Sequence, residues 1–432
     1  MKSDYGKINN DVLKHTIIEV LKEQDAQAKS GGLLDGVPFA VQNNICIAGA
    51  KLTCGSNTLS NYVSPYSATV IEWLKSEGAV PVCTVNLEEF GLEGAGSCKA
   101  TENVTKPDMM KYYSDASVSG AAALVASDYV PLAIASDAGG GTRMSSACHG
   151  VIGMKPSYRA YSRFGLTSLS PSIEQIGLIS KDIPLLRAAH RCLSSKKDPM
   201  DATHMGLENH VLSFSDSEGK IAVFAGESSS ATHPMSEALQ NAECLFANQG
   251  YLVQQVEFPF AEAAAAYYVL SCAEISASLA RITPLFAATA PNDITWNDWY
   301  RSSRNQLGKE IKNRITAGAF FLQKENYNQY YLKALAVKKK ICEYFRQIFE
   351  IHRLIITPVF PSTCSVNTGN FRLIKEPLAV NEFTTCANLA GLPAIAIPLA
   401  HNIPGGPIAI QCIAPIGKDE WLLDAAEILM NK

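Results

Sequence analysis

The chain contains 432 residues, of which 47% are hydrophobic and 18% charged, a composition typical of a globular protein with a large buried core. The formal net charge is -4 at pH 7, so the chain as a whole carries no positive field that could hold a nucleic acid backbone. No apolar run approaches the roughly 18 residues of a membrane-spanning helix, and we expect no membrane contact.

The cysteines are scattered along the chain without a C-x-x-C pair or a histidine-rich tract, a pattern that argues against zinc. Most of them lie in apolar strings, such as Cys83 in PVCTV, and the polar start MKSDYGKINND shows no secretory signal. The sequence therefore predicts reduced and buried thiols, no metal or cofactor, and a cytoplasmic or organellar-matrix location.

The first predicted element is an amphipathic helix near the start of the chain. Residues 11–24 place Leu13, Ile17, Val20 and Leu21 at helical spacing on one face. We expect residues 1–30 to form an N-terminal helical segment that packs on the body of the protein.

Short runs rich in β-forming residues recur along the rest of the chain and alternate with helical stretches. This alternation is typical of an α/β protein whose sheet is covered by helices on both faces. No linker divides the pattern, so residues 31–432 are expected to form one domain. The predicted strands are residues 37–41, 79–85, 130–134, 221–225, 354–360, 394–398 and 408–413.

The most unusual segment is ASDAGGGTRMSSACHGVIGMKPS, residues 135–157, in which three consecutive glycines follow a predicted strand and an aspartate. Glycines without a Cβ allow backbone N–H groups to converge on an anion or a developing oxyanion. The same glycines are equally compatible with a tight turn packed under a helix. From the glycines alone both interpretations stay open.

This segment resembles the signature of the amidase signature family, in which a GSDTGGSIR loop is followed by GVVGLKPT. Within that family, the flanks resemble the A subunits of glutamyl-tRNA(Gln) and aspartyl-tRNA(Asn) amidotransferases, and the likeness covers nearly the whole chain. It implies a single α/β/α layered domain around a mixed central sheet, with the glycine loop near its centre. The resembling flanks are residues 32–45, 64–90, 161–182 and 388–398.

The resemblance implies a catalytic triad of a nucleophilic serine, a bridging serine and a lysine base, and this sequence departs from it. Gln42 stands at the lysine position, and an amide cannot act as a base near neutral pH. Gly141 stands at the position of the nucleophile, and Ser117 is the one triad residue retained. The oxyanion loop would be Ala138, Gly139 and Gly140.

Other residues near the loop are candidates for a replacement nucleophile. Ser145 and Ser146 are expected on the helix that leaves the loop, pointing elsewhere. Cys148 and His149 are consecutive, and consecutive side chains diverge, so a core thiol and a packed histidine are favoured over a Cys–His dyad. Asp137 and Arg143 flank the three glycines, and we expect them to brace the loop by an ion pair.

The resemblance also implies a site for a glutamine-like small molecule. The family arginine that holds the ligand carboxylate is matched by Arg314, the tyrosine that closes the pocket by Tyr268, and the acidic residue that holds the amine by Glu382. The alternative is that Arg314 is a solvent-facing charge and Tyr268 a core residue.

The leading hypothesis is therefore a pseudoenzyme A subunit with an assembly or ligand-binding role beside B- and C-type amidotransferase subunits. It would contact tRNA only indirectly, because the only dense basic run, Lys338–Lys340, is interpreted as a solvated helix face. The alternative is an active amidase or glutaminase that supplies ammonia for transamidation of Glu-tRNA(Gln) by unrecognised or partner-rescued residues. A free-standing small-molecule sensor is a third hypothesis.

Overall fold

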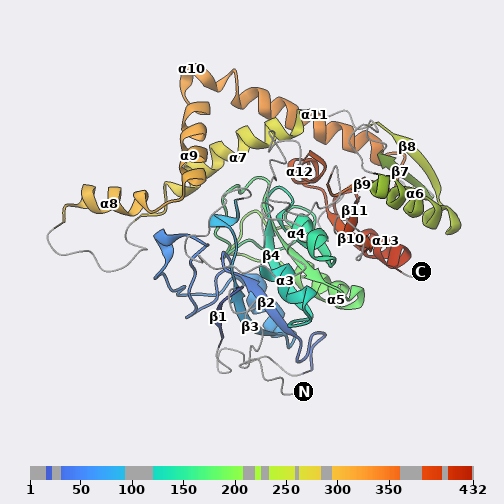
Figure 1. The fold of residues 1–432 in the computed structure, drawn as a ribbon, viewed down its shortest axis with the longest axis horizontal. Helices are drawn as coiled ribbons and strands as arrows, with labels where there is room; N and C mark the ends of the chain where they lie inside the picture. The colour runs from blue at the N-terminus through green and yellow to red at the C-terminus, as the bar shows by residue number, and fades with distance from the viewer. Residues whose placement is uncertain are drawn as a thin grey trace.

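One large mixed sheet runs through the molecule (Figure 1). The computed structural model describes residues 16–21, 31–92, 120–207, 219–224, 233–257, 262–283, 294–360, 382–400 and 407–430. Over these residues the 11-stranded sheet has the order β1-β3-β2-β4-β6-β5-β10-β11-β9-β7-β8. Its strands are β1 Ile17–Val20, β2 Pro38–Gln42, β3 Val80–Val85, β4 Leu132–Asp137, β5 Ile152–Lys155, β6 Gln175–Ser180, β7 Lys220–Phe224, β8 Leu252–Val256, β9 Leu354–Pro358, β10 Ala394–Ala400 and β11 Ile408–Ile413.

The sheet combines parallel and antiparallel pairs. Strand β2 lies between β3 and β4 and is parallel to both, and β7 is parallel to β8 and β9. The central strands, from β4 through β6, β5, β10 and β11 to β9, pair antiparallel. The expected mixed central sheet is confirmed.

Helices lie on both faces of the sheet. Helices α2, α5, α6 and α13 contribute to the large apolar cluster on one face, whereas α3, α4, α7, α11 and α12 contribute to smaller clusters on the other. Their bounds, with those of α8 to α10, are α2 Thr69–Ser76, α3 Gly120–Ala126, α4 Gly141–His149, α5 Ile183–Ser194, α6 His233–Asn248, α7 Ala263–Leu279, α8 Trp296–Asn305, α9 Lys309–Phe321, α10 Lys324–Tyr327, α11 Tyr331–Phe349, α12 Glu382–Leu389 and α13 Glu420–Met430.

The side chains of the strands alternate between these two cores, as a pleated sheet requires. In β2, Phe39 and Val41 belong to the large cluster while Ala40 faces the opposite side. In β9, Ile356 belongs to the large cluster and Ile355 to the other face. Both faces of the sheet are therefore apolar, which explains the near-continuous hydrophobic runs and confirms the α/β/α layered fold.

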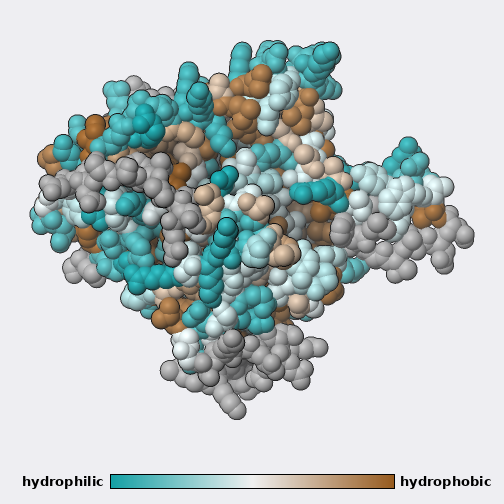
Figure 2. Space-filling model, turned by 180° about the vertical axis from the view of Figure 1, so that it is seen from behind, coloured by the Kyte–Doolittle hydropathy of each residue, from teal (hydrophilic) through white to brown (hydrophobic). Residues whose placement is uncertain are grey.

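Helices α8 to α11, with the residues that connect them, form an arm that extends from one side of the sheet and packs on α7. Helix α7 packs against both α9 and α11, and α8 and α10 lie farther out (Figure 1). The exposed large hydrophobic side chains of the arm include Phe320, Leu322, Leu332 and Leu335. From behind, hydrophobic surface interrupts the polar surface at the top of the molecule, where α10 lies in the opposite view (Figure 2).

The expected amphipathic helix over residues 11–24 is wrong where it can be checked. Ile17–Val20 form strand β1, which pairs antiparallel with β3 so that Ile17 lies opposite Val85 and Val20 opposite Cys83. Leu21 continues the pairing, since its N–H donates to the Val82 carbonyl at 3.0 Å. β-branched residues at the open edge of β3 favour the extended form over the helical one. The division of the chain at residue 30 stays a prediction.

Among the described residues, no helix combines the length and the apolar character that crossing a bilayer requires. The cysteines of the described segments are free thiols, and all but Cys244 and Cys342 are buried.

Candidate functional site

The glycine-rich loop lies where β4 ends and α4 begins. β4 ends at Asp137, and α4 starts at Gly141, so Ala138, Gly139 and Gly140 form the turn between them. Gly140 has a φ of 127°, a conformation that residues with a side chain rarely adopt. A Cβ on Gly139 would lie 2.4 Å from the Tyr267 hydroxyl oxygen, so both glycines are required by the way the loop is packed.

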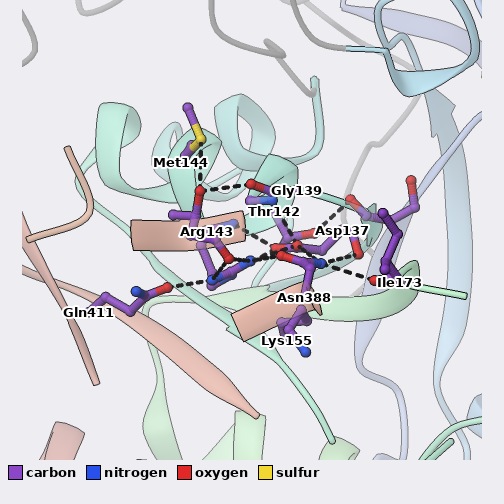
Figure 3. Close-up of polar contacts among 12 residues, drawn as sticks. Asp137, Gly139, Thr142, Arg143, Met144, Lys155, Ile173, Asn388 and Gln411 are labelled. Carbon is purple, nitrogen blue, oxygen red and sulfur yellow. Dashed lines mark hydrogen bonds and ion pairs between the residues drawn. The ribbon is translucent and has the colours of Figure 1, made fainter. Parts of the chain in front are cut away.

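Asp137 and Arg143 form the expected ion pair, and both side chains are fully buried. Arg143 donates from Nε to Asp137 Oδ2 and from Nη2 to Oδ1, each at 2.9 Å (Figure 3). Burial alone would raise the pKa of Asp137, but the Arg143 guanidinium and its hydrogen bonds lower it. Asp137 Oδ1 also accepts the Gly140 N–H at 2.9 Å, so the pair fixes the turn directly.

Helix α12 closes over the loop and completes the shell around Arg143. The Thr384 hydroxyl donates to the Gly139 carbonyl at 2.7 Å, and the Thr384 carbonyl accepts both Arg143 Nη groups at 3.1 Å. Asn388 Oδ1 accepts a further Arg143 bond at 2.5 Å, and its Nδ2 donates to Asp137. Gln411 on β11 accepts from Nη1 (Figure 3). Strands and helices distant in sequence thus hold the loop in one shape.

Gln42, at the end of β2, reaches the residue that precedes Asp137. Its Oε1 accepts the Ser136 backbone N–H at 2.7 Å, and only 2% of the residue's surface is exposed. Asn44 donates to the Ser136 hydroxyl at 2.9 Å, and the Thr142 hydroxyl donates to the Ser136 carbonyl at 3.0 Å. Gln42 and the start of α4 therefore meet at Ser136. Ser117, the third predicted triad position, lies outside the described residues.

The predicted replacement residues lie on α4. His149 forms a 2.7 Å hydrogen bond through Nδ1 with the Ser145 carbonyl of its own helix, and burial lowers the pKa of its ring. Cys148 belongs to an apolar cluster with Val359 and Ala396. These positions fit a packed histidine and a core thiol.

Arg314 and Tyr268 lie together between α9 and α7. The Arg314 guanidinium lies 4.3 Å from the centre of the Tyr268 ring, and its Nε donates to Glu310 Oε1 at 2.9 Å. Only 13% of the Arg314 side chain is exposed, so it is not a solvent-facing charge. Burial opposes its charge, but Cys272 and Glu310 raise the pKa of Arg314 above its ordinary value. Glu382 is the first residue of α12, and its side chain lies outside what the structure describes.

Three contacts of the loop were missed from the sequence. Tyr267, the residue before the predicted pocket residue Tyr268, reaches the glycine loop. Thr384 and Asn388 follow Glu382 on the same helix, and their spacing of four residues places them on one face. The consecutive tyrosines and this polar face of α12 were the available signals.

Lys155 is buried below the Asp137–Arg143 pair (Figure 3), with 1% of its surface exposed. Its Nζ donates to the Pro156 carbonyl at 3.0 Å. Burial and the nearby Arg143 charge lower the pKa of Lys155 to about 7, against the opposing effect of Asp137 and Asp419. The described residues contain no group of three His, Cys, Asp or Glu side chains that could hold a metal ion.

Comparison with known proteins agrees with this architecture. A family model described as Amidase matches residues 6–423. The A subunit of the glutamyl-tRNA(Gln) amidotransferase of Aliarcobacter butzleri is 32% identical over 431 residues, which cover 98% of this chain and 95% of that protein. Its mitochondrial counterpart in Ixodes scapularis is also 32% identical, with coverages of 97% and 87%.

The solved structure of the same amidotransferase component from Thermotoga maritima matches with a TM-score of 0.76. It is 28% identical, and the match covers 97% of this chain and 88% of that one. Fold, glycine loop and sequence likeness point the same way, and the chain belongs to the amidase signature family, with strong homology to the A subunits of glutamyl-tRNA(Gln) amidotransferases.

Proposed function

We propose that this protein is an A-subunit-like pseudoenzyme that keeps the amidase frame and a ligand pocket but has lost amide hydrolysis. The observation that carries the proposal is the chemistry of Gly141 and Gln42, the residues at the predicted positions of the nucleophile and the base. Gly141 has no side chain to attack a carbonyl, and Gln42 offers an amide whose oxygen is already bonded to the Ser136 N–H. A nucleophile and a base are both required for this chemistry.

The hydrogen bonds around the glycine loop can preserve its conformation even without catalytic activity. Asp137, Arg143 and Asn388 form a buried network in which each charged group has several partners. Breaking such a network is costly, because it leaves an uncompensated buried charge. Stability alone is therefore sufficient reason to keep the loop after the catalytic residues are lost.

The proposed ligand is a small molecule with an α-carboxylate, such as glutamine. Arg314 supports this role because its guanidinium is held against the Tyr268 ring, and a planar guanidinium can donate two parallel hydrogen bonds to a carboxylate. Glu310 already accepts the hydrogen bond from Arg314 Nε, so a ligand carboxylate would bind the Nη groups or displace Glu310. Glu382 is the proposed partner of the ligand amine.

The proposed partners are B- and C-type amidotransferase subunits, as the names of the relatives suggest. An assembly role is supported by the number of large hydrophobic side chains that the arm exposes, since burial of such surface favours association. They are Phe320, Leu322, Leu332 and Leu335. A net charge of -4 favours indirect rather than direct contact with tRNA. A cytoplasmic or organellar-matrix location fits such a complex.

The test is ammonia release from glutamine by the purified chain, measured with and without a B-type subunit, together with calorimetric titration of glutamine. We expect no ammonia above background in either case, and binding that Arg314→Ala abolishes. Arg301→Ala is the matched control, since that side chain is 77% exposed on α8. Ammonia release by the unmodified chain would instead establish the active amidase.

A further inference from the structure

Glu89 is a buried carboxylate whose two oxygens bond two different parts of the molecule. Only 4% of its surface is exposed. Oε1 accepts the Ser56 hydroxyl at 2.6 Å, and Oε2 accepts the backbone N–H of Gly308 at 2.8 Å. Gly308 is the residue that caps the N-terminus of α9, where N–H groups lack partners within the helix. One side chain thus joins the body of the protein to the arm.

Glu89 lies so close to the backbone of Gly308 that position 308 has no room for a side chain. A Cβ on Gly308 would lie 2.2 Å from Glu89 Oε2. The residue after Glu89, Phe90, has a φ of 56°, and its N–H donates to the Cys54 carbonyl at 2.6 Å. Phe90 packs in one apolar cluster with Leu307 and Ile311 from the arm. The turn is therefore fixed on both sides of the carboxylate.

The same turn also borders the glycine-loop end of the sheet. A Cβ added to Gly91 would lie 3.6 Å from the Ser136 hydroxyl oxygen and 3.8 Å from Asn44 Nδ2. Ser136 is the residue to which Gln42 bonds. At the other end, Gly308 begins the helix that carries Arg314 within its first two turns. The short turn Glu89–Gly91 therefore connects the two halves of the candidate site.

We propose that Glu89 is a positioning residue that latches α9 to the body of the protein and so fixes Arg314 relative to the glycine loop. The role of Arg314 as a ligand residue rests on the proposed function, whereas the latch itself concerns only the docking of α9. The two are therefore measured separately.

The latch has a defined pH dependence. Burial raises the pKa of Glu89, opposed by the hydrogen bonds of Ser56 and Gly308 and by Lys312, the charged side chain of α9 that acts on it. A raised pKa in the docked state means that docking binds the proton, so docking strengthens as the pH falls and weakens as the pH rises through that pKa. A protonated carboxyl can still accept from Gly308 and donate to Ser56.

The test is amide hydrogen exchange of residues 308–314 in the full-length protein. Glu89→Ala leaves the buried Gly308 N–H without its acceptor, and we expect the protection factor to fall about ten- to hundredfold. Glu89→Gln keeps an acceptor for Gly308 and mimics the protonated form, so its protection at pH 7 should equal or exceed that of the wild type. As the pH is lowered from 7, the protection factor should rise in the wild type, because the pKa of Glu89 is raised, and stay level in Glu89→Gln. Glu325→Ala, a truncation at an exposed position of α10, is the matched control and should change nothing.

A double-mutant cycle tests the contact from the other side. Gly308→Ala places a methyl group where the Glu89 carboxylate lies, while the φ of -61° at Gly308 suits alanine. Protection should fall in Gly308→Ala alone, and the same change should cost little in a Glu89→Ala background, where the methyl group has space. Unchanged protection in Glu89→Ala, or fully additive losses in the cycle, would overturn the latch.

Glutamine titration of the same variants separates the two proposals. The apparent affinity for glutamine is proportional to the fraction of molecules in which α9 is docked. Glu89→Ala should therefore bind glutamine more weakly than Glu89→Gln. If the wild type binds no glutamine, the proposed ligand role fails, and the exchange experiment still decides whether Glu89 holds α9.

Discussion

The Gln42 side chain accepts the backbone N–H of Ser136 at 2.7 Å, in a region where both residues are buried. This bond ties the end of β2 to the end of β4 immediately before the glycine loop. A lysine at position 42 could not accept it. Placing a lysine at position 42, where we predict the family base, therefore has a structural cost.

We expect Gly141→Ser alone to leave amide hydrolysis at background. A serine hydroxyl is almost wholly protonated at neutral pH, and Gln42 supplies no base for it. General-base assistance contributes on the order of 10² to 10⁴ in rate, so its absence keeps a lone serine near the uncatalysed level. Ammonia release from glutamine, followed with an enzyme-coupled assay, is the measurement.

The double variant Gln42→Lys with Gly141→Ser should recover partial activity and lose stability. Removing the acceptor for the buried Ser136 N–H costs about 1–3 kcal/mol, visible in urea unfolding. Gln42→Met with Gly141→Ser is the matched control, because it loses the same hydrogen bond without gaining an amine. Equal activity in the two double variants would show that position 42 is not the place of the base.

Arg143→Lys should destabilise the protein by about 3–5 kcal/mol, because a lysine cannot satisfy Asp137, Asn388 and the Thr384 carbonyl at once and leaves buried acceptors without donors. The measurement is the free energy of unfolding in urea. Arg346→Lys is the control, since that arginine pairs with Glu343 at the surface, where solvent screens the charges and exchange of the cation should leave the free energy of unfolding nearly unchanged.

Acid should also weaken the Asp137–Arg143 pair. Because the pKa of Asp137 is lowered in the folded protein, the carboxylate contributes stability at pH values above its ordinary pKa, and that contribution disappears as the pH falls through the lower folded value. Asp137→Asn should remove this part of the acid dependence. A variant with the wild-type slope below about pH 4 would contradict the assignment.

Lys155→Met should be more stable than the wild type at pH 7. The folded protein holds Lys155 with a pKa of about 7, whereas the unfolded chain protonates it near 10.5. Between these values the unfolded state binds more protons, so stability rises with pH, by at most about 1.4 kcal/mol per pH unit from this group. Unfolding at pH 7, 8 and 9 measures the slope.

The methionine variant should lose that slope, because its side chain does not titrate. Lys340→Met serves as the control, since Lys340 is exposed on α11 and its removal should leave the pH dependence unchanged. A wild-type slope in Lys155→Met would mean that Lys155 remains charged in the folded protein.

The fold was largely predictable from the sequence, because both faces of the sheet are buried and its strands read as apolar runs. All seven predicted strands are present. Two of the omitted strands were hard to detect for physical reasons: β5 is only four residues long, and β8 lies at an edge where most side chains are exposed. The error at Ile17–Val20 arose because apolar residues in a short edge strand also satisfy helical spacing.

The candidate site was predictable only where its residues lie in a local motif. The glycine loop and its Asp137–Arg143 pair could be read from one segment. Tyr267, Thr384 and Asn388 reach the loop across more than a hundred intervening residues, and no local pattern encodes such contacts. The assignment of Gln42 to the position of the base stays a prediction, and its bond to Ser136 could be found only in the structure.

The contact between Tyr267 and Gly139 leads to a final prediction about how α7 holds the loop. Gly139→Ala places a Cβ 2.4 Å from the Tyr267 hydroxyl oxygen and 2.6 Å from its Cζ, so the ring must move or the loop must shift. Overpacking of this kind typically costs about 1–3 kcal/mol. In a Tyr267→Ala background the ring is gone, and adding the same Cβ should cost less than about 0.5 kcal/mol, a coupling that urea unfolding of the four proteins resolves. Tyr268→Ala is the control background, because that ring lies against Arg314, and there Gly139→Ala should keep its full cost. Additive losses with Tyr267→Ala would show that α7 does not constrain the loop through this ring.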